Sequence, residues 1–301
     1  MPNPETRQRQ ALALLWITPA LWSVNYIIAR KAPAVVTPHL LALGRWGLAG
    51  LLLAWLVRQE LWTQRRAVVA AWPQHLALGT LGMLICGAWV YLGARTTGAM
   101  NIALIYAASP VLIALGAWFW LGERLWPRQM LGVALALAGV MHVIVQGRWL
   151  ALAQVSWVPG DVWIVLAMLS WAGYALLLKK WTSPLSAQAR LASTCAGGVA
   201  VLLPFALWEL GLPDTPAWGG QATALVVVAA LVPGIGAYLA YGHAQKVLGA
   251  SRVAASLYLG PLYAALAAWG VLGEPMGLHH AVGAALILPG IFLASSRPLQ
   301  R

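Results

Sequence analysis

Aromatic rings are the side chains best suited to bind a solute in this chain, which has 18 tryptophans and eight tyrosines among 301 residues. Rings accompanied by an occasional amide or hydroxyl suit planar or apolar solutes, and they attract an ammonium group by cation–π contact. The alternative for each ring is packing between helices or against lipid. The candidates for lining a central cavity are Trp22, Asn25, Tyr26, Trp89, Tyr106, Ser109, Trp171, Tyr174, Tyr238, Tyr241, Tyr258 and Tyr263.

Other residue patterns that carry chemistry are missing from the sequence. It contains no His and Cys set at metal-ligand spacing and no Gly-x4-Gly-Lys-Ser/Thr phosphate-binding loop. Cys86 and Cys195 stand far apart in apolar segments, where a small buried thiol is expected rather than a disulfide. The sequence therefore predicts no metal, no cofactor and no enzymatic activity.

Hydrophobic residues make up 61% of the chain and charged residues only 9%. Because a soluble domain carries about 25% charged residues, the composition predicts an integral membrane protein, which we expect to be all-α. Stretches of about 20 apolar residues are long enough to span a bilayer as helices. Ten such stretches are separated by charged or Pro/Gly-rich breaks, at roughly 11–30, 39–57, 76–94, 99–121, 128–146, 161–178, 190–209, 221–243, 250–272 and 278–295.

Ionisable residues are nearly excluded from the interior of these spans. All seven acidic residues are terminal or lie near span ends, so no carboxylate at the membrane midplane is an obvious proton carrier. Arg45 is the best-placed charge inside a span, where it is costly unless it is paired, hydrated or able to reach the membrane surface. Arg45 could hold the carboxylate of a solute, or it could extend to the outer face, and the sequence leaves both roles open.

Lysine and arginine are distributed unevenly over the connections. With the N-terminus in the cytoplasm, most of the 19 fall in cytoplasmic segments, whereas the outer loops hold Arg30, Lys31, Arg95 and Arg148. Basic residues favour the cytoplasmic side, so both termini are predicted to be cytoplasmic in a bacterial-type inner membrane. Contact with anionic lipids of the inner leaflet then accounts for the net charge of +12 without a nucleic-acid partner.

One motif occurs twice in the chain. Pro-x10-Leu-Gly-Glu occupies 110–123 and again 261–274, and each copy is followed at the same distance by Gly-x6-Gly. A repeat of this size indicates duplication of a whole structural unit. The chain is therefore predicted to consist of two repeats of five spans each, 11–145 and 161–295, joined by a link at 146–160.

Because each repeat has an odd number of spans, the second repeat must be inverted across the membrane relative to the first. Glu123 then faces the cytoplasm and Glu274 the outer side. Inverted repeats are typical of secondary transporters, whose solute site lies near the membrane midplane between the repeats. The sequence therefore favours a transporter.

The repeated motif has two parts with different expected roles. Pro110 and Pro261 lack an N–H and clash with the preceding turn, so each should kink its helix, either as a hinge beside the solute site or as a packing kink. Glu123 and Glu274 are expected to cap the N-termini of the helices that follow them. Proton or ion coupling is the alternative role, which their positions at the membrane faces disfavour.

Two inverted five-helix repeats, each ending in Pro-x10-Leu-Gly-Glu and Gly-x6-Gly, resemble the drug/metabolite transporter (DMT) superfamily and within it the EamA type. The resemblance covers roughly 11–145 and 161–295, and Arg45 resembles an arginine common in that family. The second copy departs from the first by having Pro275 after the glutamate, where the first has Arg124. The aromatic-rich composition is also similar to the YddG-like amino-acid exporters.

The resemblance implies an inner-membrane carrier that exports a small metabolite, such as an aromatic or apolar amino acid, by alternating access. The solute would bind among the first, third, fourth, sixth, eighth and ninth helices. Nucleobases and amine or drug cations are the alternative solutes, and a polytopic membrane enzyme or a channel is less favoured, since neither clustered acids nor a filter loop occurs in the sequence. A monomer or weak dimer is expected.

Overall fold

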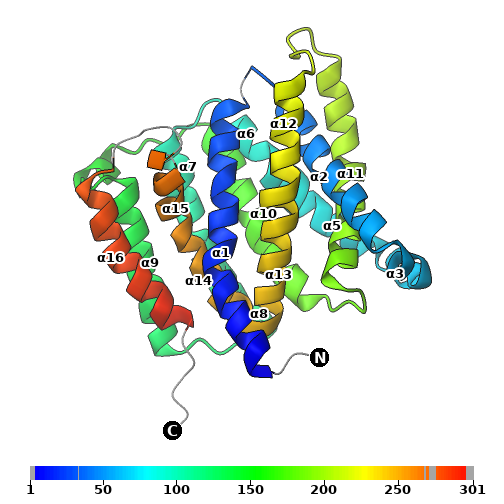
Figure 1. Cartoon of the computed structure of the whole chain (residues 1–301). Coiled ribbons are helices and arrows are strands. Elements are labelled where there is room, and N and C mark those ends of the chain that lie inside the picture. Colours follow the sequence, from blue (N-terminus) through cyan, green and yellow to red (C-terminus); the bar gives the residue numbers. More distant parts are fainter. Residues whose placement is uncertain (1–3, 33, 268, 271–275, 296–301) are drawn as a thin grey trace.

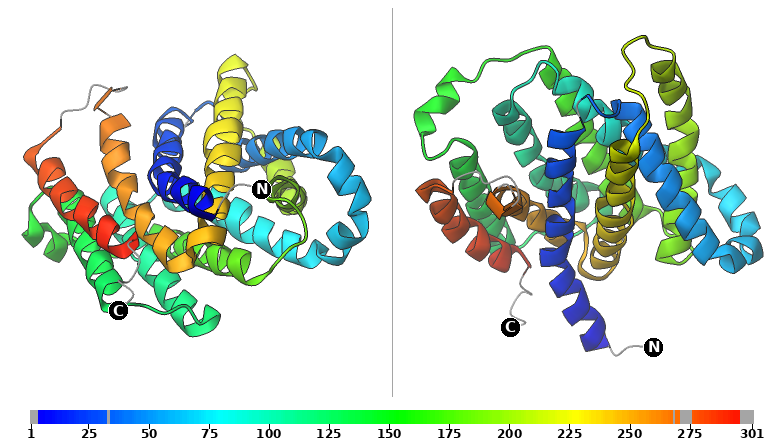
Figure 2. Two further views of the ribbon diagram at one scale, coloured as in Figure 1. Left: turned by 60° about the horizontal axis from the view of Figure 1, so that its bottom comes forward. Right: turned by 45° about the horizontal axis from the view of Figure 1, so that its top comes forward.

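The computed structural model describes residues 4–32, 34–267, 269–270 and 276–295, and these ranges contain helices and turns but no strand. Figure 1 and Figure 2 show the helices packed together in a single bundle. The elements before the link are α1 (Pro4–Lys31), α2 (Pro38–Leu56), α3 (Arg58–Thr63), α4 (Arg65–Ala70), α5 (Trp72–Gly79), η1 (Thr80–Trp89), α6 (Val90–Gly93), α7 (Ala99–Ala107), α8 (Ser109–Leu121) and α9 (Pro127–Ile144). They are followed by η2 (Trp149–Gln154), α10 (Gly160–Lys180), α11 (Ala187–Leu210), α12 (Gly220–Ala229), η3 (Ala230–Gly236), α13 (Ala237–Leu248), α14 (Ala250–Ser256), η4 (Leu257–Leu259), α15 (Gly260–Ala267) and α16 (Leu278–Ser295).

Nine helical stretches in the described ranges are long and apolar enough to cross a membrane. The one remaining predicted crossing, roughly 250–272, is described from Ala250 to Ala267 as α14, η4 and α15, and part of its end lies outside the described residues. The predicted all-α membrane fold is therefore confirmed. The first helix begins at Pro4, before the apolar stretch that starts at Ala11, because the intervening Glu, Arg and Gln residues are good helix formers although they are polar.

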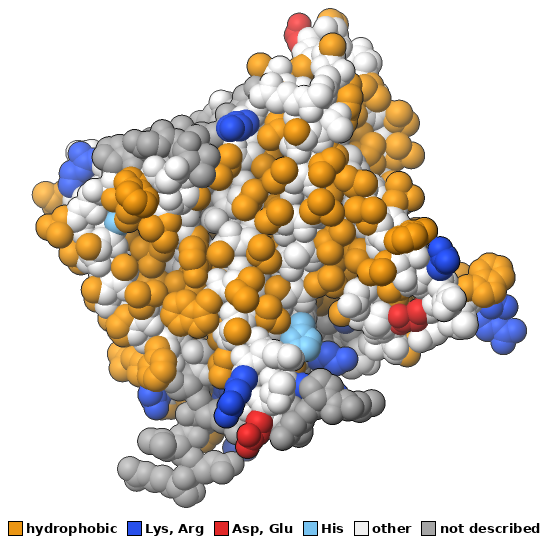
Figure 3. Space-filling model, viewed as in Figure 1, with side chains coloured by type: hydrophobic (Ala, Val, Ile, Leu, Met, Phe, Trp, Pro, Cys, Tyr) orange, Lys and Arg blue, Asp and Glu red, His pale blue; other side chains and the backbone are white. Residues whose placement is uncertain are grey.

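In Figure 1, α1 begins and α16 ends at the bottom of the bundle, which we call the terminal face; the top is the opposite face. The short helices α3 and α4 form an elbow between α2 and α5, and Figure 1 shows α3 projecting from the side of the bundle. Figure 3 shows hydrophobic side chains over the middle of the molecule and Lys and Arg toward its edges. This distribution is typical of a surface surrounded by lipid.

The last crossings of the two repeats, α9 and α16, pack along a seam of glycines. A Cβ atom added to Gly132 would lie 2.5 Å from the carbonyl oxygen of Gly290, and one added to Gly139 would lie 2.9 Å from that of Gly283. These are the repeated Gly-x6-Gly pairs, and the first glycine of each pair meets the last of the other. Such crosswise pairing requires antiparallel helices, so the second repeat is inverted relative to the first. The missing side chains allow the two backbones to approach closely.

The remaining helix contacts follow the same two-fold relation. α1 packs on α13 and α15, and its equivalent α10 packs on η1 and α8. α2 packs on its own equivalent, α11, and the broken crossing α7–α8 meets the broken crossing α14–α15 through α8 and α14. The main core therefore lies at the interface between the repeats.

The two crossings that carry the repeated prolines, Pro110 and Pro261, are interrupted just before the proline. α7 ends at Ala107 and α8 begins at Ser109, while the second crossing passes through the 3-10 turn Leu257–Leu259 before it reaches Pro261. This agrees with the steric restriction that proline imposes on the preceding turn. Two π-helical segments, η1 and η3, have no counterpart among the predicted features, and of these two only η3 contains a proline, Pro233. π-Helical turns are rare and frequently occur at functional sites.

Candidate functional site

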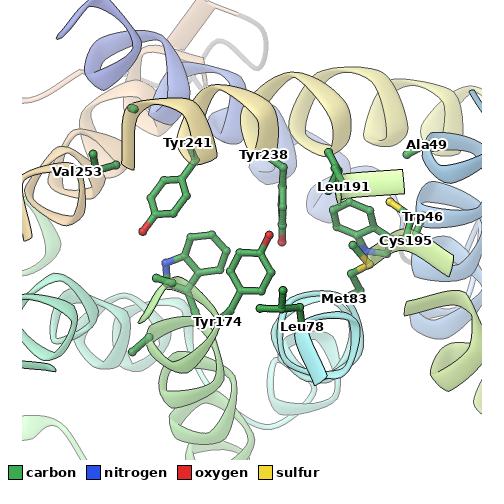
Figure 4. Close-up of a cluster of buried hydrophobic side chains, with 14 of the residues drawn as sticks. Trp46, Ala49, Leu78, Met83, Tyr174, Leu191, Cys195, Tyr238, Tyr241 and Val253 are labelled. Carbon is green, nitrogen blue, oxygen red and sulfur yellow. The ribbon is translucent and has the colours of Figure 1, made fainter. Parts of the chain in front are cut away.

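Six aromatic rings meet at the interface between the repeats and form what we call the aromatic cluster. They come from α1, α2, α10 and α13 and are Trp22, Trp46, Trp171, Tyr174, Tyr238 and Tyr241. In Figure 4, Tyr238 and Tyr241 point from α13 toward Tyr174 of α10. Trp46 is the member that the sequence prediction missed, although it follows the in-span Arg45 directly.

Trp171 lies at the centre of the aromatic cluster. Its ring centroid is 5.1 Å from that of Trp22, in an edge-to-face arrangement, and 5.3 Å from that of Tyr174, in a stacked one. The Tyr241 ring is also 5.3 Å away. Aromatic pairs at such distances contribute about 0.5–1.5 kcal/mol each beyond the burial of their surface. Since Trp171 is 7% exposed and Tyr241 only 1%, the cluster is closed by its own rings.

Two tyrosine hydroxyls inside the cluster differ in their partners. The Tyr238 hydroxyl donates a hydrogen bond to the carbonyl oxygen of Gly82, in the π-helical segment η1, at 3.0 Å. The buried Tyr241 hydroxyl has no hydrogen-bond partner among the described residues. Burial of a hydroxyl without a partner costs about 1–3 kcal/mol. Tyr241 therefore offers an unused polar group to a molecule that enters the cluster.

Arg45 is buried beside the cluster and does not extend to the membrane surface. Its Nη2 donates to the carbonyl oxygen of Pro233 at 3.0 Å, and its Nη1 lies 3.4 Å from the Asn25 side-chain oxygen. The guanidinium lies 4.5 Å from the centroid of the Trp46 ring, which in turn lies 4.8 Å from the Tyr238 ring. Arg45 Nε has no partner, and no acidic side chain of the described residues forms an ion pair with Arg45. The structure thus holds an uncompensated cation at the edge of the aromatic cluster.

Two of the predicted cavity residues, Trp89 and Tyr106, each have a partner that is not a member of the cluster. The Trp89 ring packs edge-to-face on Trp163, which is 38% exposed, with centroids 5.3 Å apart. The Tyr106 hydroxyl lies 3.9 Å from the sulfur of Cys86. A role for Trp89 or Tyr106 in binding stays a prediction.

Three further predicted residues lie at or beyond the helix breaks. Tyr258 is buried, and its hydroxyl donates to the carbonyl oxygen of Ala107 at 3.1 Å. Tyr263 packs against the core between α9 and α16. Ser109 is buried, and its hydroxyl has no partner among the described residues. The side chain of Tyr26 falls outside the part of the chain that the structure describes.

Glu123 caps a helix other than the one predicted. Its carboxylate accepts hydrogen bonds from the backbone N–H of Ala250 at 2.7 Å and of Ser251 at 3.0 Å, and from the Ser251 hydroxyl at 2.7 Å. It therefore caps α14 of the other repeat and not α9, which follows it. The reason is Gly122, which ends α8 in the left-handed conformation (φ 67°) and turns the chain. Glu274 lies outside the described residues.

Two other glutamates cap helices of the opposite repeat. Glu60 accepts hydrogen bonds from the backbone N–H and the hydroxyl of Ser186, the N-cap residue of α11, both at 2.6 Å. Glu209 accepts from the backbone N–H of His39 at 2.9 Å and of Leu40 at 3.2 Å, at the start of α2. His39 Nδ1 is also 2.7 Å from the Glu209 carboxylate. Glu60 and Glu209 occupy equivalent positions in the two repeats, and this equivalence is the sequence signal that could have predicted the two caps.

A pocket of about 290 Å³ lies at the opposite face, away from the cluster, and is lined by Thr96, Gly98, Asn101, Ala151, Gln154, Val155, Ser156 and Val158. No group of three His, Cys, Asp or Glu side chains in the described part of the chain could hold a metal ion. The arrangement at the interface is therefore suited to binding an organic solute through aromatic surface, a hydroxyl and a cation.

Known proteins resemble this chain along nearly its whole length. It is 26% identical to an uncharacterized transporter of Archaeoglobus fulgidus, over 95% of this chain and 98% of that protein. It is 27% identical to a probable terminal-alkyne amino-acid exporter of Streptantibioticus cattleyicolor, over 95% and 96% of the two chains. An S-adenosylmethionine/S-adenosylhomocysteine transporter of Chlamydia muridarum is 24% identical, over 91% and 88%.

One comparison concerns the fold and another the family. A solved crystal structure superposes with a TM-score of 0.77 at 19% identity, covering 96% of this chain and 97% of that one. The model of the EamA-like transporter family matches residues 10–145 and again 158–296. Since these two matches together cover most of the sequence, the chain belongs to the EamA-like transporter family, within the DMT superfamily, and is a multi-pass membrane protein.

Proposed function

We propose that this protein is a secondary transporter that exports a small carboxylate-bearing metabolite with an apolar or aromatic part, such as an amino acid, by alternating access. The observation that carries the proposal is Arg45, a buried guanidinium without an acidic partner beside the aromatic cluster. A cation in a membrane interior is costly unless it is paired. A solute carboxylate would supply the missing counter-charge.

The surrounding groups suit the rest of such a molecule. The rings of the aromatic cluster would contact an apolar or aromatic side chain, and the Tyr241 hydroxyl is available to a polar group of the solute. An ammonium group would be held against a ring face. Because the cluster is closed by its own rings, the solute would enter only when the repeats move apart.

The named solutes of the relatives agree with this class. One relative is a probable exporter of an amino acid, and another transports a methionine derivative and its homocysteine counterpart. Nucleobases and amine or drug cations are the second candidates. Arg45 disfavours the cations, because a guanidinium with no acidic partner repels them. The solute is proposed to cross unchanged, without catalysis and without a cofactor.

We also propose that the terminal face is cytoplasmic, in a bacterial-type inner membrane. The elbow of α3 and α4 supports this orientation, because its arginines lie beside tryptophans suited to the interface. The Arg58 guanidinium lies 5.8 Å from the Trp55 ring centroid, and that of Arg65 lies 5.0 Å from the Trp62 ring centroid. Such pairs would contact anionic headgroups of the inner leaflet. No nucleic-acid partner is proposed, and a monomer or weak dimer of two five-helix repeats, 11–145 and 161–295, is the expected unit.

The test compares a carboxylate with its amide in liposomes that contain the purified protein. Phenylalanine and phenylalaninamide differ in the group that Arg45 would bind, and a panel of other amino acids, nucleobases and amines extends the comparison by counterflow. Loss of a hydrogen bond to a charged group costs about 1.5–3 kcal/mol, which is roughly 10- to 150-fold in affinity. We expect the native protein to prefer the acid by about this factor.

Arg45→Gln should abolish the preference, whereas Arg190→Gln should keep it. Arg190 is the matched control because its guanidinium is already satisfied by the carbonyl oxygens of Leu178 and Trp181, at the end of α10. Equal transport of acid and amide by the native protein would refute the proposed solute class. A preference that survives in Arg45→Gln would refute the role of Arg45.

A further inference from the structure

Three glutamates each cap a helix that belongs to the other repeat. Two of them, Glu60 and Glu209, are repeat-equivalent, whereas Glu123 is a cap of another kind. Glu60 caps α11 at the terminal face, and Glu209 caps α2 at the opposite face. The two caps are repeat-equivalent, and both are formed at the same time. The α2–α11 pair is therefore fastened at both ends, so it does not need to open on either side.

The Glu123 cap is the other kind. It joins the end of α8 to the start of α14 at the terminal face, through three hydrogen bonds of 2.7–3.0 Å. Gly249 makes room for it: its φ is +92°, and an added Cβ would lie 3.0 Å from Glu123 Oε1. Glu274, the repeat equivalent of Glu123, lies outside the described residues.

The helix packing beside the Glu123 cap agrees with this contact. Among the described residues, α8 packs on α14 at the terminal face, while α7 packs mainly on α10 and α15, described as far as Ala267, packs mainly on α1. The two broken crossings are joined at their breaks by the hydrogen bond from Tyr258 to Ala107, residues 151 positions apart. This separation is also that between Pro110 and Pro261, so the contact joins equivalent positions and lies on the two-fold axis between the repeats.

We propose that the Glu123 carboxylate is the latch of the cytoplasmic gate and that the protein opens to the cytoplasm when this carboxylate leaves the N-terminus of α14. The segments α8 and α14 then part about the Tyr258–Ala107 contact, while the α2–α11 pair stays closed. Charge-assisted hydrogen bonds to the N-terminus of a helix are strong in a partly buried site, which makes this cap a suitable closing contact. The inference goes beyond the proposed solute class but rests on alternating access and on the proposed orientation.

The test measures access to the seam between α8 and α14 and needs no solute. Val253 of α14 is 0% exposed, and Figure 4 shows it within the core. Val253→Cys, in a background with Cys86→Ala and Cys195→Ala, is labelled in inside-out vesicles with a membrane-impermeant maleimide. Glu123→Gln should raise the labelling rate several-fold, and Ser251→Ala, which removes one of the three donors, should raise it less.

Glu60→Gln is the matched control, because Glu60 also caps a helix of the other repeat at the same face. It should lower the thermal unfolding temperature and leave labelling unchanged. Each variant is first shown to elute as a single species, which separates gate opening from misfolding. Unchanged labelling in a folded Glu123→Gln protein would overturn the proposal, and so would an equal rise in Glu60→Gln. Since no solute is present, either result leaves the preference for carboxylates to be decided by the transport assay.

Discussion

The glycine seam between α9 and α16 predicts that a side chain added there lowers the free energy of unfolding. A Cβ on Gly132 would lie 2.5 Å from both the Gly290 oxygen and the Ala294 nitrogen, which are backbone atoms that no rotamer change can move. Gly132→Ala must therefore push the two helices apart, and overpacking of this kind costs about 1–3 kcal/mol. Alanine also favours a helix over glycine by about 0.8–1.0 kcal/mol. The net expectation is a loss of about 0–2 kcal/mol in the free energy of unfolding.

Gly47→Ala is the control, because a Cβ at Gly47 of α2 would meet nothing within 4 Å. It keeps the helix-propensity gain of up to about 1 kcal/mol without the clash. The difference between the two variants, about 1–3 kcal/mol, isolates the cost of separating α9 from α16. The free energy of unfolding is measured in detergent against increasing dodecyl sulfate, with tryptophan fluorescence as the signal. Equal stability of the two variants would refute the tight seam and, with it, the structural explanation of the repeated Gly-x6-Gly pairs.

Two further predictions concern the aromatic cluster. Trp22→Ala and Trp171→Ala should each weaken solute binding by roughly 2- to 30-fold, as expected for aromatic contacts of about 0.5–2 kcal/mol. Normal saturable flux of the double variant in liposomes would exclude the cluster as the site. Tyr241→Phe removes a buried hydroxyl that has no partner, so the free energy of unfolding should stay the same or rise by up to about 1–3 kcal/mol, while the affinity for a solute that uses the hydroxyl falls. A clear loss of stability would show that the hydroxyl is bonded in the folded protein.

The architecture could be predicted because its signals are repeated along the chain. The sequence shows the spans by their apolar length, the topology by the placement of Lys and Arg, and the repeat by the duplicated Pro-x10-Leu-Gly-Glu motif. Inversion follows from the odd number of spans in each repeat. Inversion also accounts for Trp22 and Trp171: they are equivalent positions, and the two-fold relation brings their rings to 5.1 Å. Side-chain partners set by long-range packing were harder to predict.

Glu123 illustrates that limit. A glutamate just before a helix is a reasonable cap for that helix, but the next helix, α9, begins with Pro127, whose nitrogen has no hydrogen to donate. The start of α14, brought alongside by the packing of the repeats, offers free N–H groups instead. Trp46 was missed for a related reason, since its place in the cluster depends on α2 lying against η3, the segment directly before α13, which carries Tyr238.

The aromatic cluster lies on the two-fold axis but is not itself symmetric. Tyr238 lies 5.8 Å from Trp22, yet the repeat equivalent of Tyr238 is Trp89, which packs on Trp163 and not on Trp171. In two perfectly equivalent repeats, the outward-open and inward-open states would have equal free energies, because the two-fold operation exchanges them. Under the proposed alternating access, we therefore expect substitutions such as tyrosine for tryptophan at this pair to bias one state over the other. We also expect the inverted fold to supply both gates, and the unpaired side chains around the axis, Arg45 above all, to determine how strongly a solute favours either state.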